Sequence, residues 1–196
     1  DRTIDVAARL WRISPTTLVE LLSRGGRARI VTNPFALEKP HGNFRDFKGK
    51  YQLNSLMAEQ VADLAIEAAG ASAKNNERTY KQFIDKGQSP TYANTELLKR
   101  FFQNLMRRTP TAAELEPLLA LLEKVDAELG APRGMQAAFA AMILQPESIF
   151  RYEATDRDGD DDLIALTPRE LAYALSYSLT DRPPHQTVMK AFEQEK

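Results

Sequence analysis

The chain has 196 residues, of which 43% are apolar, as expected of a protein with a buried core. Its 26 basic and 27 acidic residues give a formal net charge of -1, without the basic excess typical of nucleic-acid binders. It contains no cysteine, which excludes disulfides, thiolate zinc sites, iron–sulfur clusters and C-x-x-C-H haem attachment within this chain. No run approaches the roughly 20 apolar residues of a membrane span.

The first part of the chain predicts two short helices and a long loop. Residues 5–12 show helical periodicity, and Ser14 followed by Pro15 is a typical start for a helix that ends at Gly25. Prolines and glycines are frequent over residues 32–50, where we expect an ordered loop.

A stronger helix is predicted over residues 55–69, where apolar residues recur at helical spacing. We expect a polar break over residues 71–76, a second helix over 77–85 and a loop over 88–93. That loop is the predicted boundary between the two halves.

The second half begins with a helix from residue 94 or 95 to 108. Thr111 to Glu114 is a capping box that opens a helix as far as Leu129, and Gly130 ends it. Another helix is predicted from Met135 to Ile143.

Two further helices are predicted after an acidic segment. Thr167 to Glu170 is a second capping box, and a last helix follows Pro184. We expect four residues of the first of these helices to face inward: Leu171, Ala174, Leu175 and Ser178.

These patterns predict an all-α fold, an irregular bundle of roughly seven to nine helices without a convincing strand. The expected organisation is an N-terminal helical region with a long loop (1–90), a central helical domain (91–153), and an acidic linker with the start of a further domain (154–196). One contiguous core is predicted from the apolar stripes: Phe101, Leu105, Leu118, Leu122, Phe139, Met142, Ile143, Leu171 and Leu175.

Candidate metal ligands are few. The chain has two histidines, His41 in a loop and His185 near a helix start, and neither has a partner at ligand spacing. The alternating Asp156, Asp158 and Asp160 could supply oxygen ligands to calcium. Their spacing breaks the EF-hand pattern, which favours a solvated acidic linker.

No catalytic residue is predicted. Ser148 lacks the context of a hydrolase nucleophile. Glu147, Glu153 and Glu170 are interpreted as helix caps or solvated charges, and Arg107–Arg108 as cations closing a helix. Tyr173 and Tyr177, one turn apart, are expected to pack at a helix–helix contact.

A family pattern covers the second half of the chain. The segment from Leu97 to Glu153 resembles a domain of planctomycete-type, cytochrome c-associated multidomain secreted proteins. The matching residues include Phe101, Arg107, Arg108, Thr111, Ala137, Ala141, Leu144, Pro146, Phe150, Arg151 and Glu153. The stretch from Leu166 to Pro184 resembles the start of the next domain of those proteins, and His41 to Phe44 more faintly resembles a preceding one.

The resemblance implies a haem-free helical structural or interaction module of a periplasmic or secreted protein. It implies a c-type haem in the full-length parent, and as partner a cytochrome c domain of that parent or a redox protein. Two alternatives stay open, namely part of a haem-coupled oxidoreductase completed by other domains, and a carbohydrate or cell-surface binding module. Because the second resemblance stops after two helices, we expect the chain to be a piece of a longer protein.

Overall fold

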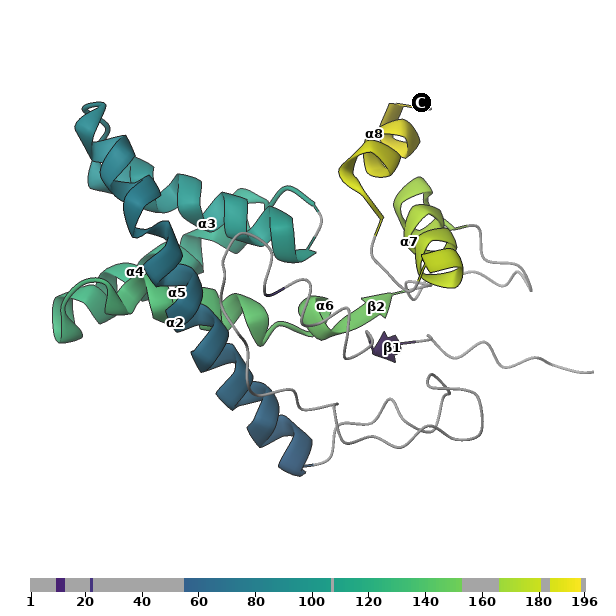
Figure 1. Ribbon diagram of the computed structural model, residues 1–196, viewed down its shortest axis with the longest axis horizontal. Coiled ribbons are helices and arrows are strands. Elements are labelled where there is room, and N and C mark those ends of the chain that lie inside the picture. The colour runs from purple at the N-terminus through teal and green to yellow at the C-terminus, as the bar shows by residue number, and fades with distance from the viewer. Residues whose placement is uncertain are drawn as a thin grey trace, which may run out of the picture.

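The fold is an all-α multi-helix bundle, as predicted (Figure 1). The structure is a computed structural model that describes residues 10–12, 22, 55–106, 108–152, 166–180 and 184–194. Within these ranges it has seven helices and two three-residue strands. No helix in the described ranges has both the length and the apolar character to cross a membrane.

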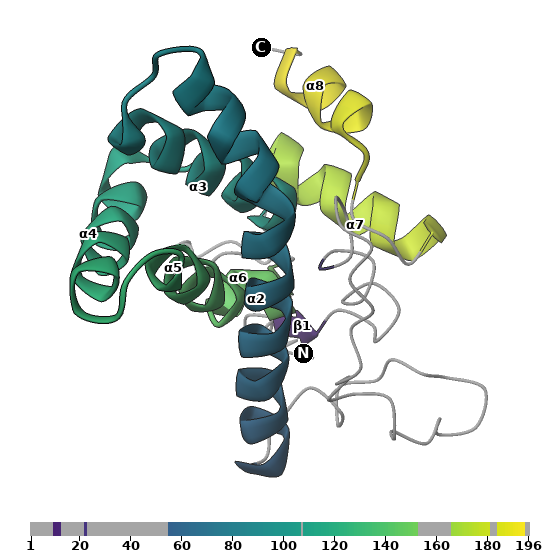
Figure 2. The ribbon, with the colours of Figure 1, turned by 60° about the vertical axis from the view of Figure 1, so that its left-hand side comes forward.

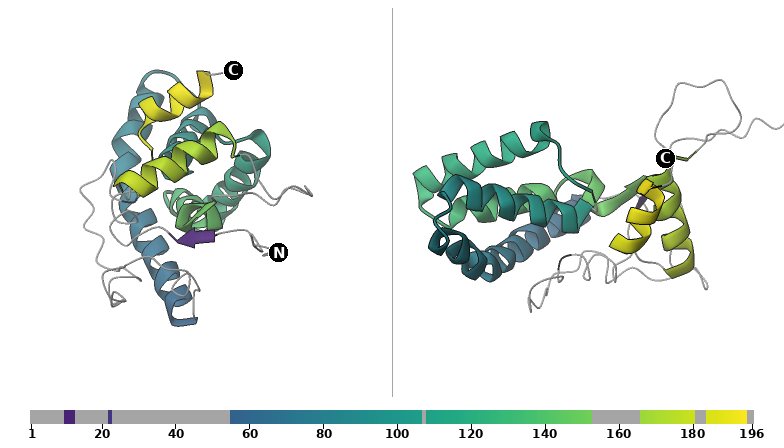
Figure 3. Two further views of the ribbon diagram at one scale, coloured as in Figure 1. Left: turned by 90° about the vertical axis from the view of Figure 1, so that its right-hand side faces the viewer. Right: turned by 90° about the horizontal axis from the view of Figure 1, so that it is seen from above.

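The body of the bundle consists of α2 (Ser55–Asp85), α3 (Pro90–Met106), α4 (Ala112–Leu129) and α5 (Arg133–Ile143). The long helix α2 runs beside α3 and α5, and α4 packs on the other side of α5 (Figure 2). The short helix α6 (Pro146–Ile149) leads into strand β2 (Phe150–Tyr152). The last helices, α7 (Pro168–Thr180) and α8 (Gln186–Gln194), form a pair at the opposite end of the molecule from α4 (Figure 3).

Helix α2 corrects the predicted break over residues 71–76, because its 31 residues are continuous. Ala73 is buried there, and the Asn76 side-chain amide donates to the Ser72 carbonyl oxygen at 2.8 Å. The polar residues of this stretch are compatible with a turn or with a helix, and the helix continues because α2 packs against α3 and α5.

Helix α3 begins earlier than residue 94, at Pro90. The Ser89 hydroxyl oxygen accepts a hydrogen bond from the Tyr92 backbone N–H at 3.1 Å, so Ser89 caps the helix and Pro90 occupies its first turn. Helices α4 and α5 match their predicted ranges, and Gly130 ends α4 with a φ of 80°.

A helix is predicted over residues 5–12, and this prediction is wrong for residues 10–12, which form a strand. Strand β1 (Leu10–Arg12) pairs antiparallel with β2, Leu10 lying opposite Tyr152 and Arg12 opposite Phe150. Helical periodicity gives no signal for a pairing across 140 positions, and a helix this short has little stability of its own. The remaining residues of that segment, and the predicted helix over 14–25 except Leu22, lie outside the described residues.

One core joins α2 to the central helices. Phe102, Phe139, Leu98 and Met142 have no exposed surface, and the Phe101 ring stacks on Phe139 with centroids 4.0 Å apart. Six residues of the predicted core belong to this cluster: Leu105, Leu118, Leu122, Phe139, Met142 and Ile143. Phe101 is partly buried against it.

Helix α7 presents a different face from the one predicted. Leu171 is 39% exposed and Leu175 is 46% exposed, so neither belongs to the core. Ser178 is also exposed and Ala174 is half-buried. Instead, Ala172 and Tyr177 are the buried residues of the helix. The face that packs on the body is the one whose Arg169 and Tyr173 make polar contacts with α3 and α6.

Candidate functional site

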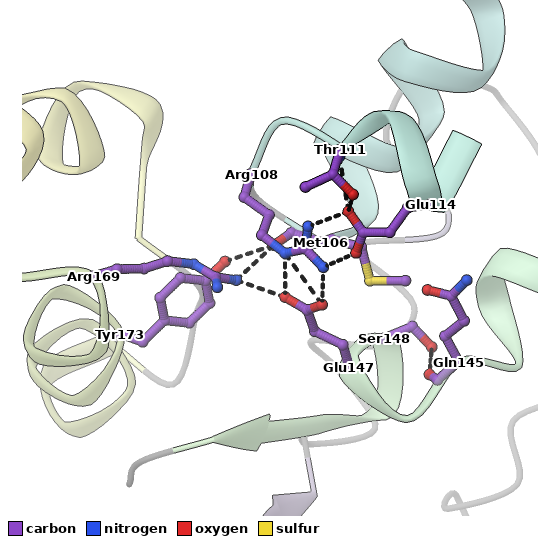
Figure 4. A network of polar contacts seen from close by, with 9 residues as sticks. All are labelled: Met106, Arg108, Thr111, Glu114, Gln145, Glu147, Ser148, Arg169 and Tyr173. Carbon is purple, nitrogen blue, oxygen red and sulfur yellow. Dashed lines mark hydrogen bonds and ion pairs between the residues drawn. The ribbon is translucent and has the colours of Figure 1, made fainter. Parts of the chain in front are cut away.

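A network of charged side chains joins α7 to the central helices (Figure 4). It connects Arg108, which follows α3, with Glu114 in the first turn of α4, Glu147 on α6 and Arg169 on α7. We call these four residues the charged network. Their side chains are between 22% and 40% exposed.

Arg108 is the centre of the network. Its Nη1 and Nη2 donate to the two carboxylate oxygens of Glu114 at 2.8 and 2.5 Å. Its Nε and Nη2 donate to Glu147, at 3.0 Å to Oε1 and 2.7 Å to Oε2. The guanidinium also lies 4.9 Å from the centroid of the buried Phe102 ring. Such paired, forked contacts fix an arginine far more strictly than a single ion pair.

Local sequence explains how Glu114 is positioned. Its Oε2 accepts hydrogen bonds from the backbone N–H and the hydroxyl of Thr111, both at 2.8 Å. These contacts are the predicted capping box, which is therefore confirmed. The same carboxylate thus caps α4 and holds Arg108. The second predicted box is confirmed too, because Thr167 makes the equivalent contacts with Glu170.

Helix α7 is fastened through one face. Arg169 Nη2 donates to Glu147 Oε1 at 2.6 Å and to the Met106 carbonyl oxygen at 3.2 Å. The Tyr173 hydroxyl donates to the same carbonyl oxygen at 3.2 Å. Met106 is the last residue of α3, so its carbonyl lacks a partner inside that helix. The two α7 side chains therefore complete the end of α3.

Tyr177, one turn beyond Tyr173, extends this attachment into the core. Its ring centroid lies 6.1 Å from that of Tyr173, and its side chain belongs to the main apolar cluster. The prediction that the two tyrosines pack at a helix contact is confirmed. One group is less well satisfied, since Arg169 Nε is buried without a hydrogen-bond partner in the described part of the chain.

The network keeps its carboxylates ionised. Hydrogen bonds from Arg108 lower the pKa of Glu114 to about 2. Burial by itself raises the pKa of Glu147, but the hydrogen bonds from Arg108 and Arg169 outweigh it and leave the pKa lowered. The contacts with Glu114 and then Glu147 raise the pKa of Arg108. A general acid or base needs a pKa near the working pH, so this arrangement orients helices rather than transferring protons.

Of the two histidines considered as metal ligands, only His185 lies in the described part of the chain. His185 is exposed, and its Nδ1 accepts a hydrogen bond from the Thr187 backbone N–H at 3.3 Å, at the start of α8. His41, Asp156, Asp158, Asp160, Glu153 and Arg107 lie outside the described residues. Within the described ranges, no three His, Asp or Glu side chains are grouped so that they could hold a metal.

The sequence gives no sign that Arg108 and Glu147 form an ion pair, or that Tyr173 binds the end of α3 beside them. Glu147 follows Pro146 in the first turn of α6, and Arg108 follows a helix end. Each position has a complete local explanation, so neither carries a signal for a partner 39 positions away. Ser148 is buried beside Glu147, where its hydroxyl contacts the Ile143 and Gln145 carbonyl oxygens and so secures the turn between α5 and α6.

Comparison with known proteins gives one family. Residues 93–153 match PSD5, a protein of unknown function (DUF1595). The match covers less than a third of the chain. It begins within α3 and ends one residue after β2. Neither the curated proteins nor the solved structures give a significant match. Arg108, Glu114 and Glu147 lie inside the matched segment and Arg169 lies outside it, so the charged network connects the two.

Proposed function

We propose that this chain is a haem-free structural and interaction module that packs beside a cytochrome c domain of the same periplasmic or secreted parent protein. The observation that carries the proposal is the outward row of leucines on α7. Leu171, Leu175 and Leu179 are 39%, 46% and 80% exposed and lie one turn apart. We call these three residues the leucine face.

The leucine face is held in a fixed direction. Arg169, Tyr173 and Tyr177 also lie one turn apart, and they bind α7 to the body of the bundle. Two positions along a helix correspond to about 200° of rotation, so the leucine face points away from the attached face. A helix fastened by its polar and aromatic side thus presents its aliphatic side to a partner.

The size of the leucine face suits a partner in the same polypeptide. The exposed parts of the three side chains amount to less than two whole leucines, and burying them contributes about 2–5 kcal/mol. That is weak for two free proteins. It suffices for tethered domains, whose effective concentration reaches the millimolar range.

In this proposal the haem is bound by another domain of the parent protein. A c-type haem is attached through two cysteine thiols, and the chain contains no cysteine, so its residues do not fit a covalent haem site. The resemblance to cytochrome c-associated proteins supports a haem domain in the parent. The module's contribution is to position that domain, and no reaction step is assigned to its own residues.

The proposal is tested with the full chain and the parent's cytochrome c domain, which a C-x-x-C-H motif identifies. Titration calorimetry and co-elution followed by haem absorbance should show association that Leu175→Glu abolishes. The matched control is Ile66→Glu, which places the same charge on an apolar residue of α2 that is 69% exposed. A parent without the motif, or equal binding by both variants, contradicts the proposal.

A further inference from the structure

A cavity of about 270 Å³ lies where α2, α3 and the turn between α4 and α5 meet, away from the charged network and the leucine face. Its lining combines an apolar floor with a polar rim. The buried lining residues, which form the floor, are apolar: Ala73, Leu97 and Met135. The polar lining residues are half-buried or exposed and form the rim: Asn76, Glu77, Tyr80, Lys81, Asn94 and Asp126.

The size of the cavity limits its occupant. Drug-sized ligands use cavities of about 300–1,000 Å³, so this one suits a molecule with a single ring. The side chains of Leu97 and Met135 and the ring of Tyr80 offer apolar surface to such a molecule. A ligand without any apolar face would leave that surface uncovered.

The rim offers hydrogen-bonding groups that the protein has not used. Asn76 donates one amide hydrogen to the Ser72 carbonyl, which leaves its Oδ1 as an acceptor. Asp126 accepts the Gly134 backbone N–H at Oδ1, 2.6 Å away, which leaves its Oδ2. Neither the Asn94 amide nor the Tyr80 hydroxyl makes a hydrogen bond within the described part of the chain.

From these observations we propose that the cavity binds a neutral, ring-sized polyol of the monosaccharide class. Side-chain amides donate and accept at once, as hydroxyl groups do, so Asn76 and Asn94 match a ligand with several hydroxyls. The apolar floor takes the C–H face of the ring. This ligand site is independent of the docking role of the leucine face, and its test is separate.

Charge on the rim favours a neutral ligand over an ionic one. Glu77 and Asp126 disfavour an anion, and Lys81 offsets part of the attraction that these two carboxylates exert on a cation. Burying an ion beside a like charge costs more than burying a hydroxyl group that finds partners. Hydroxyl groups can donate to the two carboxylates and accept from the ammonium group, so a neutral polyol suits all three charged groups.

The test is an NMR titration of the full chain, observing backbone and side-chain amides. The probes are glucose, galactose and N-acetylglucosamine, with benzylamine as the cationic and benzoate as the anionic comparison. We expect saturable, millimolar binding of at least one sugar, with shifts confined to residues that line the cavity.

Asn94→Leu should weaken sugar binding at least tenfold and leave the helical circular dichroism unchanged, since the Asn94 side chain makes no hydrogen bond in the described part of the fold. Asn104→Leu is the matched control, an exposed asparagine of the same helix that does not line the cavity. Saturation by benzylamine or benzoate but by no sugar overturns the ligand class. Shifts outside the cavity, or no binding by any probe, overturn the site.

Discussion

Gly134 is the position where a single added carbon should disturb this fold most. An alanine Cβ there would lie 2.1 Å from the Leu122 carbonyl oxygen and 2.8 Å from Cγ and Oδ1 of Asp126. The 2.1 Å contact is with backbone of α4, which cannot rotate out of the way as a side chain can. Helices α4 and α5 must therefore separate by more than about 1 Å to restore an ordinary contact.

The cost follows from three contributions. Overpacking of this kind costs about 1–3 kcal/mol. Separation also stretches the 2.6 Å hydrogen bond from the Gly134 N–H to the Asp126 carboxylate, a kind of bond that contributes about 1.5–3 kcal/mol. The higher helix propensity of alanine offsets up to about 1 kcal/mol of this loss in the free energy of unfolding. The expected loss for Gly134→Ala is about 2–4 kcal/mol, a fall in Tm of about 4–16 °C for a chain of this size.

Gly70→Ala is the matched control. Gly70 lies inside α2, and nothing stands within 4 Å of the added Cβ. Here the same substitution should stabilise the protein by about 0.5–1 kcal/mol. Both variants are compared by urea denaturation followed by helical circular dichroism. Equal midpoints for Gly134→Ala and the wild type, or losses of similar size in both variants, would refute this account of the α4–α5 contact.

Three other predictions follow from the core and the charged network. Phe139→Ala should cost about 3–5 kcal/mol in urea denaturation, because the ring is fully buried and stacks on Phe101; an unchanged midpoint would contradict its place in the core. The folded-state pKa values of Glu114 and Glu147 are lowered, so their stabilisation is present above the unfolded value of about 4.3 and disappears as pH falls through the folded values, about 2 for Glu114. Between about pH 5 and 2, the wild type should therefore lose more stability than Glu114→Gln, and parallel acid profiles would argue against the ion pairs. Arg169→Met should speed amide hydrogen exchange in α7 but not in α4, and equal exchange in both helices would show that the arginine does not fasten α7.

Much of the second half of the fold could be predicted because its signals are local. The Thr111 and Thr167 boxes mark helix starts, and Gly130 marks a helix end, through interactions within four residues. The apolar spacing of α4 and α5 identifies the faces that pack together. These local interactions do not depend on how distant parts of the chain fold.

The errors occur where distant segments decide the outcome. Residues 71–76 are helical because α2 packs along α3 and α5, and β1 is a strand because β2 lies beside it. The cavity is likewise assembled from four helices and a turn, so no single stretch of sequence indicates it. Local propensity is a weak guide when tertiary contacts set the energy.

Helix α7 shows most clearly why apolar periodicity alone can choose the wrong face. Its sequence offers two rows at the same spacing, the leucine face and the row of Arg169, Tyr173 and Tyr177. The leucine face is the more apolar, but it cannot satisfy the Met106 carbonyl at the end of α3 or the ionised Glu147. Leaving such groups buried and unpaired costs about 1–3 kcal/mol each, more for a charge. The row that supplies hydrogen bonds together with aromatic surface is therefore the one that faces the body. The leucines are exposed as a consequence of that choice, and this exposed row is the surface on which the proposed docking of a partner depends.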